Sequence, residues 1–236
     1  DEEIRFLLLT PTDHDMAADG WPVTLYSHGT GGDYESCRGD TRELVADGIA
    51  VLCMDQPLHG PRGPDGVQLS DLELVLYSFN FVNPYAGRSS FRQAAIDSIL
   101  MARMVEAGRF DLAGDSTLSR KSLALDPEKI FFFGHSHGGL SGTLAMAVDS
   151  RIKAAVISGM SGVIIETILR RKDPADLATL SANLLHIDVE DLDSFHPALN
   201  LMQMLVDATD PVNYTRYWVS PRSAVPAKSV FVTQGT

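Results

Sequence analysis

The chain has 236 residues, and 44% of them are hydrophobic, which is enough apolar material for a single sizeable core. Its formal net charge of −12 argues against nucleic acid or an anionic membrane surface as a partner, because both attract positively charged proteins. The apolar runs have the length of strands, and none approaches the roughly 18 to 20 residues that an integral membrane span needs.

Short apolar runs alternate with helical patterns along the chain, which is typical of βαβ units. Strands are expected at residues 5–10, 23–27, 50–54, 130–133, 154–158 and 229–233. Helices are expected over residues 36–47 and 91–107, and each is followed by a glycine, which is common directly after a helix. The sequence therefore predicts an α/β fold with a mostly parallel, doubly wound sheet.

Two cysteines, Cys37 and Cys53, are too few for a disulfide framework or a metal site. We expect two ordinary thiols, with one surface bridge between them as the alternative, so the redox compartment stays open. The chain begins at Asp1 without an initiator methionine, a basic segment or an apolar segment. This beginning is expected to be a cut edge.

A glycine-rich turn, Tyr26-Ser27-His28-Gly29-Thr30-Gly31-Gly32, includes the end of the second expected strand. Glycines allow successive backbone N–H groups to point at one spot, which is the arrangement of an oxyanion loop. A phosphate cradle is the alternative, but a Walker-type loop would need Gly-Lys followed by Ser or Thr, which this turn lacks. The turn therefore predicts an oxyanion loop that contains His28, Gly29, Thr30 and Gly31.

The stretch Gly134-His135-Ser136-His137-Gly138 follows the expected strand at 130–133 and precedes a helical pattern of small residues. It matches G-x-S-x-G in the strand–turn–helix context of a nucleophile elbow. A sharp turn strains the serine backbone, and both glycines are needed where a Cβ would collide with neighbouring chain. Ser136 is therefore predicted to be a nucleophile, with a glycine-rich phosphate or packing turn as the alternative. The N–H groups of Thr30 and His137 are its expected oxyanion donors.

Residues 162–228 interrupt the βαβ rhythm, because they separate two expected strands by far more chain than a simple crossover needs. Asp173-Pro174 and His196-Pro197 are typical helix starts. An apolar stripe follows the second start and is more often core packing than a substrate surface: Leu199, Met202, Leu205 and Val206. We expect residues 162–228 to form a helical cap or lid, part of which overhangs Ser136.

Three motifs resemble the α/β-hydrolases and follow the order of that family: His28-Gly29, Asp55-Gln56-Pro57-Leu58-His59-Gly60, and the elbow at residues 134–138. The second is similar to the D-x-x-G-H-G turn of bacterial esterases and dienelactone-hydrolase-like members, with Leu58 in place of the usual glycine. The resemblance spans most of the chain. It implies an eight-stranded, mostly parallel sheet, a Ser-acid-His triad and hydrolysis of ester or related acyl bonds.

The family order of serine, acid and histidine leaves few of the seven histidines as a general base. The resemblance implies that His28 and His59 serve in packing and loop hydrogen bonds. His135 and His137 flank Ser136 too closely to turn back on it. We expect His135 to pack the elbow and His137 to form a wall of the pocket.

His14 precedes the nucleophile, which leaves His186 and His196. Both lie in the insertion and precede the strand after which relatives place the acid. Gln234-Gly235-Thr236 is similar to the start of the turn in which relatives place this acid, a residue or two later. We therefore expect residues 1–236 to be an α/β-hydrolase core that is truncated at the C-terminus and lacks the last strand, the catalytic acid and the catalytic histidine. A separate C-terminal chain or segment would supply them.

Together these features predict a serine hydrolase, esterase- or lipase-like, that cleaves carboxylic esters through an acyl-enzyme on Ser136. The substrate would be a small-molecule or lipid ester, and no metal or organic cofactor is implied. An acyltransferase or a peptidase would use the same elbow. A non-catalytic α/β-hydrolase-like binding module is the alternative from another class, because no acid or base is evident. The intact elbow argues against it, since a binding module has no need of a strained serine.

Overall fold

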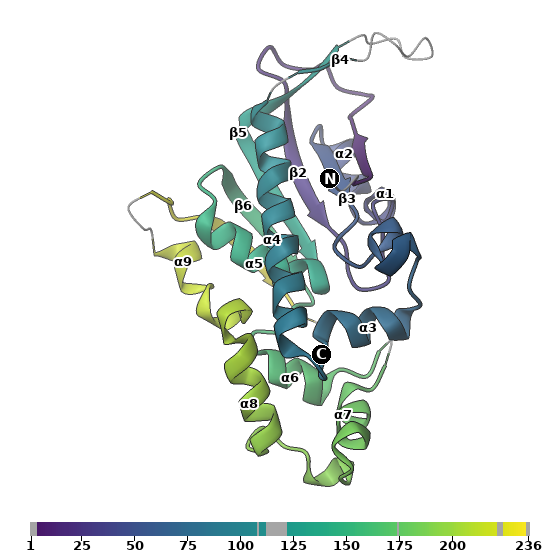
Figure 1. Ribbon diagram of the computed structural model, residues 1–236. Helices are drawn as coiled ribbons and strands as arrows, with labels where there is room; N and C mark the ends of the chain where they lie inside the picture. The colour runs from purple at the N-terminus through teal and green to yellow at the C-terminus, as the bar shows by residue number, and fades with distance from the viewer. Residues whose placement is uncertain (1–3, 108, 112–121, 174, 221–223, 235–236) are drawn as a thin grey trace.

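The computed structural model describes residues 4–107, 109–111, 122–173, 175–220 and 224–234, and within them seven strands form one sheet (Figure 1). The strands are β1 (Phe6–Leu9), β2 (Trp21–Ser27), β3 (Ala50–Met54), β4 (Arg109–Asp111), β5 (Ser122–His135), β6 (Ile152–Ser158) and β7 (Ser229–Thr233). Their order across the sheet is β1-β3-β2-β5-β6-β7, and β4 pairs with β5 outside this path.

The inner strands of the sheet are parallel. Strands β3, β2, β5, β6 and β7 each run parallel to the next, whereas β1 and β4 run antiparallel to their partners. The α/β fold and the mostly parallel sheet predicted from the sequence are confirmed, and every expected strand has a counterpart. The family resemblance implied eight strands, and the described residues form seven.

Strand β5 is much longer than the strand expected at residues 130–133, because it starts at Ser122. Its first part pairs antiparallel with β4, a strand that no sequence pattern indicated. The register against β2 shifts between Leu125 and Ile130, where Asp126-Pro127 lies. This pair is typical of a turn, so the sequence hid the first half of the strand.

Helices cover both faces of the sheet (Figure 1). Helices α1 (Cys37–Asp40) and α2 (Arg42–Ala46) pack on one face, where Val51 and Cys53 of β3 point. Helices α4 (Pro84–Glu106) and α5 (His137–Val148) pack on the other face, over the larger part of the core. Because helices cover both faces of the mostly parallel sheet, the arrangement is doubly wound.

Two helices begin where capping residues place them. Helix α4 begins at Pro84, earlier than the expected start at residue 91, and the side chain of Asn83 accepts the Ala86 N–H at 3.3 Å. Helix α3 (Asp71–Phe79) was not expected, although Ser70 and Glu73 form a capping box at its start. Short 3₁₀ turns complete the chain: η1 (Gly60–Arg62), η2 (Pro64–Gly66), η3 (Val189–Asp191), η4 (Asp207–Thr209) and η5 (Pro211–Asn213).

Cys37 of α1 and Cys53 of β3 form a disulfide bond with a Cα–Cα distance of 6.5 Å. The expectation of two ordinary thiols is therefore wrong, and the bridge is buried rather than on the surface. Helix α1 packs directly over β3, so the two side chains share one small apolar cluster with Tyr26 and Val51. Cysteine spacing alone could not indicate this contact between a helix and a neighbouring strand.

Reduction of this disulfide should lower the free energy of unfolding by about 2 to 3 kcal/mol, because the bond closes a loop between residues 16 apart in sequence. Urea unfolding with and without a thiol reductant measures the difference. The double variant Cys37→Ala/Cys53→Ala is the control, since its unfolding should not respond to the reductant. Equal unfolding curves for the oxidised and reduced wild type would contradict the prediction.

The insertion at residues 162–228 forms four helices among its described residues: α6 (Ile164–Arg170), α7 (Leu177–Leu185), α8 (Pro197–Val206) and α9 (Arg216–Val219). Figure 1 shows α6, α7 and α8 beyond the end of the sheet at which α5 begins. Helix α8 starts at Pro197, as expected. Helix α7 starts at Leu177, later than the expected start at Pro174, and Pro174 itself lies outside the described residues. Leu199 and Met202 of the expected apolar stripe are buried, so this stripe is core packing.

Buried polar contacts connect the helices of the insertion to one another. The carboxylate of Asp210, which is fully buried, accepts hydrogen bonds from the Ile164 N–H at 2.9 Å and from Gln203 Nε2 at 2.7 Å. A buried carboxylate is stable only when it is paired in this way. These bonds fix the start of α6 relative to α8.

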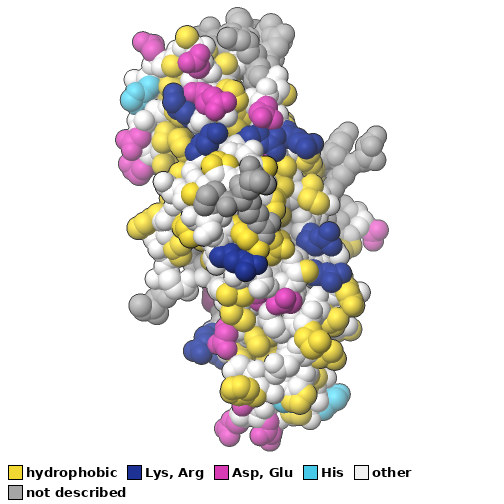
Figure 2. All heavy atoms as spheres, turned by 90° about the vertical axis from the view of Figure 1, so that its left-hand side faces the viewer, with side chains coloured by type: hydrophobic (Ala, Val, Ile, Leu, Met, Phe, Trp, Pro, Cys, Tyr) yellow, Lys and Arg dark blue, Asp and Glu magenta, His cyan; other side chains and the backbone are white. Residues whose placement is uncertain are grey.

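The outer surface of the insertion carries apolar side chains, which Figure 2 shows over the lower part of the molecule. The most exposed apolar residues of the insertion include Phe195 and Met204. None of the helices that the structure describes combines the length and the apolar character needed to cross a membrane.

Candidate active site

Ser136 occupies the sharp turn between β5 and α5. Its backbone has a φ of 50° and a ψ of −112°, a conformation that residues other than glycine rarely adopt. The Ser136 N–H donates to the Ser158 carbonyl at 2.7 Å, and the Gly139 N–H donates to the Ser136 carbonyl at 2.9 Å. The strained serine expected from the sequence is thus present, and hydrogen bonds on both sides hold it.

Gly134 and Gly138 allow backbone segments to approach too closely for a side chain. A Cβ at Gly138 would lie 2.0 Å from the Ser27 carbonyl oxygen, and one at Gly134 would lie 2.7 Å from the Gly138 carbonyl oxygen. The spacing of glycines around Ser136 is therefore a requirement of close packing between β2, β5 and α5, as the sequence predicted.

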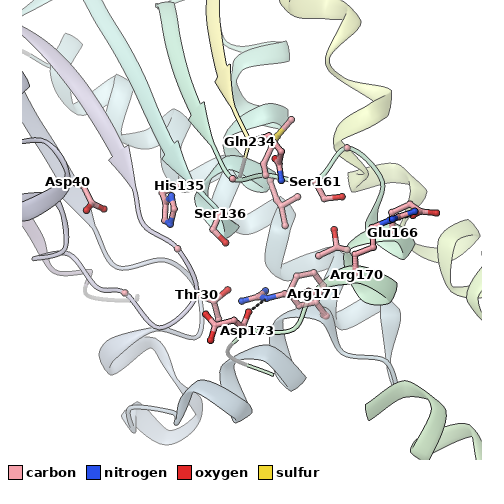
Figure 3. Close-up of a pocket in the computed structure, with 18 of the residues that line it drawn as sticks. Thr30, Asp40, His135, Ser136, Ser161, Glu166, Arg170, Arg171, Asp173 and Gln234 are labelled. Atoms are coloured by element: carbon pink, nitrogen blue, oxygen red, sulfur yellow. Dashed lines mark hydrogen bonds and ion pairs between the residues drawn. The ribbon is translucent and has the colours of Figure 1, made fainter. Parts of the chain in front are cut away.

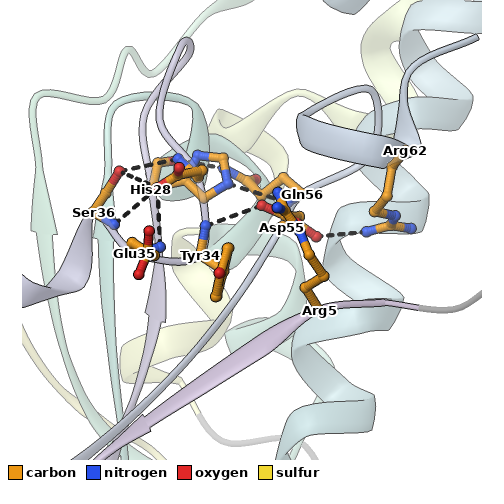
Figure 4. A network of polar contacts seen from close by, with 9 residues as sticks. Arg5, His28, Tyr34, Glu35, Ser36, Asp55, Gln56 and Arg62 are labelled. Atoms are coloured by element: carbon orange, nitrogen blue, oxygen red, sulfur yellow. Dashed lines mark hydrogen bonds and ion pairs between the residues drawn. The ribbon is translucent and has the colours of Figure 1, made fainter. Parts of the chain in front are cut away.

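Two buried histidines, His28 and His59, connect the glycine-rich loop after β2 with the turn after β3, and Figure 4 shows the first of them. His28 Nδ1 lies 2.8 Å from the Gly29 carbonyl oxygen, and its Nε2 accepts the Gln56 N–H at 3.2 Å. His59 Nδ1 lies 3.0 Å from a carbonyl oxygen of its own turn, and its Nε2 accepts the Gly31 N–H at 3.3 Å. Each ring has one donor and one acceptor, so both imidazoles are neutral and hold the loop.

Burial, together with the nearby His59, lowers the pKa of His28 to about 4. Burial also lowers the pKa values of His59 and His137. In the unfolded chain these groups take up protons below about pH 6.5, whereas in the folded protein they do not until the pH is much lower. The folded state is therefore stabilised above pH 6.5, and this stabilisation is lost as the pH falls toward 4.

The free energy of unfolding should decrease as the pH is lowered from 6.5 toward 4, with roughly 3 kcal/mol from His28 alone. Urea unfolding at several pH values measures the slope. His28→Gln should flatten it, and His14→Gln is the matched control, because His14 is exposed and bonds a backbone carbonyl at 2.8 Å. A slope that His28→Gln leaves unchanged would refute the assignment.

Asp55 anchors the turn after β3 (Figure 4). Its buried carboxylate accepts Arg5 Nε at 2.8 Å and the Tyr34 N–H at 3.0 Å, and its carbonyl accepts Arg62 Nη1 at 2.7 Å. Leu58 has a φ of 71°, so the turn keeps the left-handed conformation at the position where the resemblance has glycine. The change from glycine to leucine leaves the turn intact.

The two expected oxyanion donors are free. Among the described residues, neither the Thr30 N–H nor the His137 N–H donates a hydrogen bond to another protein group. The Gly138 N–H donates to the His28 carbonyl at 3.0 Å, which joins the elbow to the loop of Thr30. His137 is also the first residue of α5, where the helix dipole favours a negative charge.

His135 was expected to pack the elbow and His137 to form a wall of the pocket, and the structure shows the reverse. His135 is exposed and lines a cavity beside Ser136, with its Nδ1 3.4 Å from Ser158 Oγ. His137 is only 1% exposed and stacks on Phe91 of α4 with ring centroids 4.8 Å apart. Because α5 packs on α4, its first side chain turns into the core. Only the backbone of His137 remains available to the site.

A cavity of about 1000 Å³ opens beside Ser136 (Figure 3). Its core side includes Gly29 and Thr30 of the glycine-rich loop. The insertion contributes Gly162, Glu166, Thr167, Arg170, Arg171 and Asp173. These six residues of the insertion therefore line the same cavity as Ser136.

Two residues of this region were not indicated by the sequence. The Gln56 side chain accepts Ser141 Oγ at 3.3 Å and donates to the His28 carbonyl, so it links three segments around the elbow. Arg171 enters the cavity from the end of α6. The only sequence signal for Arg171 was the basic run Arg170-Arg171-Lys172, a pattern that solvated helix ends share.

None of the seven histidines, all of which lie among the described residues, hydrogen-bonds the Ser136 hydroxyl. His186 ends α7 and His196 caps α8, so neither insertion histidine reaches the elbow. Gln234 after β7 lines the cavity, and the rest of the expected acid turn, Gly235-Thr236, lies outside the described residues. The described residues also hold no group of His, Cys, Asp or Glu that could bind a metal ion.

A mostly parallel sheet that carries a strained serine between a strand and a helix, next to a glycine-rich loop, defines the class of the α/β-hydrolases. The chain belongs to the alpha/beta hydrolase family, whose model matches residues 23–233. The resemblance inferred from three motifs is thereby confirmed.

Several solved structures share this fold. The acetyl xylan esterase from Paenibacillus sp. R4 is 17% identical with a TM-score of 0.58 over 97% of this chain and 63% of its own. Acetyl xylan esterase 1 from Thermoanaerobacterium sp. JW/SL YS485 is 15% identical with a TM-score of 0.58 over 97% and 62%. A puromycin-hydrolyzing peptidase of Mycobacterium tuberculosis is 15% identical with a TM-score of 0.51 over 98% and 28%. The chain thus spans less than two thirds of the length of these proteins. A search of curated protein sequences finds no match.

Proposed function

We propose that the protein is a serine hydrolase that cleaves carboxylic esters through an acyl-enzyme on Ser136. Ser136 Oγ bonds to the acyl carbon while the alcohol leaves with a proton, and water then releases the acid and restores the serine. The N–H groups of Thr30 and His137 donate to the oxyanion of both tetrahedral intermediates. The acetyl xylan esterases of the same fold support an ester as the bond that is cleaved.

The observation that carries the proposal is the conformation of Ser136. Its positive φ costs stability of the order of 1 to 3 kcal/mol, which a packing serine would not need. The turn directs the residue at a large cavity and lies beside two unused N–H groups. Strain, cavity and free donors together favour catalysis over the non-catalytic binding module.

We propose that a separate chain or segment supplies the general base and its acid. This part of the proposal rests on the seven histidines, whose neighbours leave none of them at the Ser136 hydroxyl. Among the described residues β7 is the last strand of the sheet, and Phe231 on it is 64% exposed. Gln234, which follows β7, lines the same cavity as Ser136.

The first part of the insertion acts as a lid that shapes the preference for the acyl chain. Its residues 162–173 lie on the cavity wall, and Asp210 fixes their position relative to α8. A panel of p-nitrophenyl esters of increasing chain length, applied to the natural full-length protein, measures this preference. Matched p-nitroanilides, which carry an amide bond, separate esterase activity from peptidase activity.

A fluorophosphonate probe tests the nucleophile directly. We expect stoichiometric labelling of the folded full-length protein, located at Ser136 by peptide mass spectrometry, since only an activated serine reacts. No labelling of the folded protein, together with binding of small ligands, would favour the non-catalytic module. Transfer of the acyl group to an added alcohol in place of water would identify an acyltransferase.

A further inference from the structure

The charged side chains of the cavity beside Ser136 differ in their pairing. Arg170 donates to Glu166 at 2.7 Å and its side chain is largely exposed. Asp40 accepts the Tyr26 hydroxyl at the far side of the cavity (Figure 3). Arg171 forms no ion pair with a carboxylate of the described residues, although the charge of Asp173 lies near enough to act on it, and its direct contacts are a backbone carbonyl and an aromatic ring. It is therefore the cation of the cavity whose charge is left for a ligand.

Protein contacts hold the Arg171 guanidinium in one place. Its Nε donates to the Asp173 carbonyl at 2.8 Å, and its Cζ lies 5.5 Å from the centre of the Phe79 ring. Phe79 is itself buried and packs edge-on against Phe91. Because only Nε is used, both terminal amino groups remain available, and these two groups form the fork that fits a carboxylate.

The position of Arg171 brings this fork to the elbow. Figure 3 shows its side chain running from the end of α6 toward Thr30, beside Ser136. The Thr30 hydroxyl is a second polar group without a partner, since its Oγ1 is buried and makes no hydrogen bond with a described residue. Burial lowers the pKa of Arg171, which reflects the loss of water around it, and a guanidinium stays protonated at neutral pH even so.

We propose that Arg171 binds a carboxylate of the substrate, so that the enzyme prefers esters that carry an anionic group next to the scissile bond, such as monoesters of dicarboxylic acids. The inference rests on the proposed ester hydrolysis at Ser136. A half-buried cation without an ion-pair partner is costly, and a carboxylate from the substrate supplies an opposite charge and accepts from both amino groups. The specificity for a negative charge thus comes from the insertion, while the core supplies the nucleophile.

Hydrolysis of two matched esters tests the preference in the full-length protein. The first is 4-nitrophenyl hemiglutarate, and the second is 4-nitrophenyl 5-methylhexanoate, in which an isopropyl group replaces the carboxylate. In Arg171→Met the ratio of their kcat/KM values should fall about 10- to 100-fold in favour of the neutral ester, as for the loss of a charged hydrogen-bonded pair. Arg171→Lys should recover part of the ratio, because a lysine keeps the charge and loses the fork.

Lys172→Met is the matched control, because it removes the same charge one residue away. Lys172 is exposed, pairs with Asp176 at 2.8 Å and does not line the cavity. The ratio should stay at the wild-type value in this variant. A drop of equal size in Lys172→Met would show a general effect of net charge and overturn the assignment to Arg171.

Binding of glutarate, measured by calorimetry in Ser136→Ala, tests the anion site without catalysis. We expect binding in Ser136→Ala and its loss in Ser136→Ala/Arg171→Met. Hydrolysis that depends on Ser136, with an unchanged ester ratio and no glutarate binding, would overturn the inference and leave the proposed function standing. Glutarate binding that requires Arg171, with no hydrolysis of either ester by the wild type, would overturn the proposed ester hydrolysis and leave Arg171 as an anion-binding residue.

Discussion

Ser136→Ala should reduce ester hydrolysis by the full-length protein by about 10⁶-fold in kcat and leave its fold intact. The hydroxyl makes no hydrogen bond within the described residues that the fold would lose, and the backbone bonds of Ser136 to Ser158 and Gly139 do not involve the side chain. Steady-state hydrolysis of a p-nitrophenyl ester measures the loss, and urea unfolding checks the fold.

Ser161→Ala is the comparison for this prediction. Ser161 lines the same cavity, but its hydroxyl already donates to the Val163 carbonyl at 3.0 Å, so it has no role as a nucleophile. Its loss should reduce hydrolysis far less than the loss of Ser136. If the Ser136→Ala variant hydrolyses the p-nitrophenyl ester at a tenth of the wild-type rate or faster, Ser136 is not the nucleophile.

The sheet was largely predictable because its inner strands contain apolar runs. Strand β3 is an example, since all of residues 50–54 are buried. The first half of β5 was not predictable, because Asp126-Pro127 has the composition of a turn, and pairing with β4 and with Trp21 of β2 keeps this part of the chain extended. The start of α4 at Pro84 was also missed. The helix begins after its N-cap residue Asn83, whereas the helical spacing of apolar residues begins only at Phe91.

The elbow was predictable because its chemistry leaves a local mark: the glycines flanking Ser136 by two residues are fixed by backbone contacts. Three other features depend on tertiary packing and leave no such mark. The Cys37–Cys53 bond joins a helix to a strand, His137 turns inward because α5 meets α4, and Arg171 faces the site only because α6 packs there. Sequence could name these residues but not their neighbours.

Gly138→Ala should lower the free energy of unfolding by about 3 to 5 kcal/mol. The added Cβ would lie 2.0 Å from the Ser27 carbonyl oxygen and 2.5 Å from its carbonyl carbon. Both atoms belong to the backbone at the end of β2, which parallel pairing with β3 and β5 holds in place. The strand or the first turn of α5 must therefore move, and urea unfolding measures the cost.

Gly39→Ala is the matched control, because the same methyl group enters helix α1 where nothing lies within 4 Å of the new Cβ. There the substitution should stabilise the protein by about 0.5 to 1 kcal/mol, since alanine loses less backbone entropy on folding than glycine. The activity should separate the two variants as well. Any movement of α5 displaces Ser136 and the His137 N–H together, so the Gly138→Ala protein that still folds should hydrolyse esters poorly. Wild-type stability and activity in Gly138→Ala would mean that the close approach of β2 and α5 is not required by the elbow.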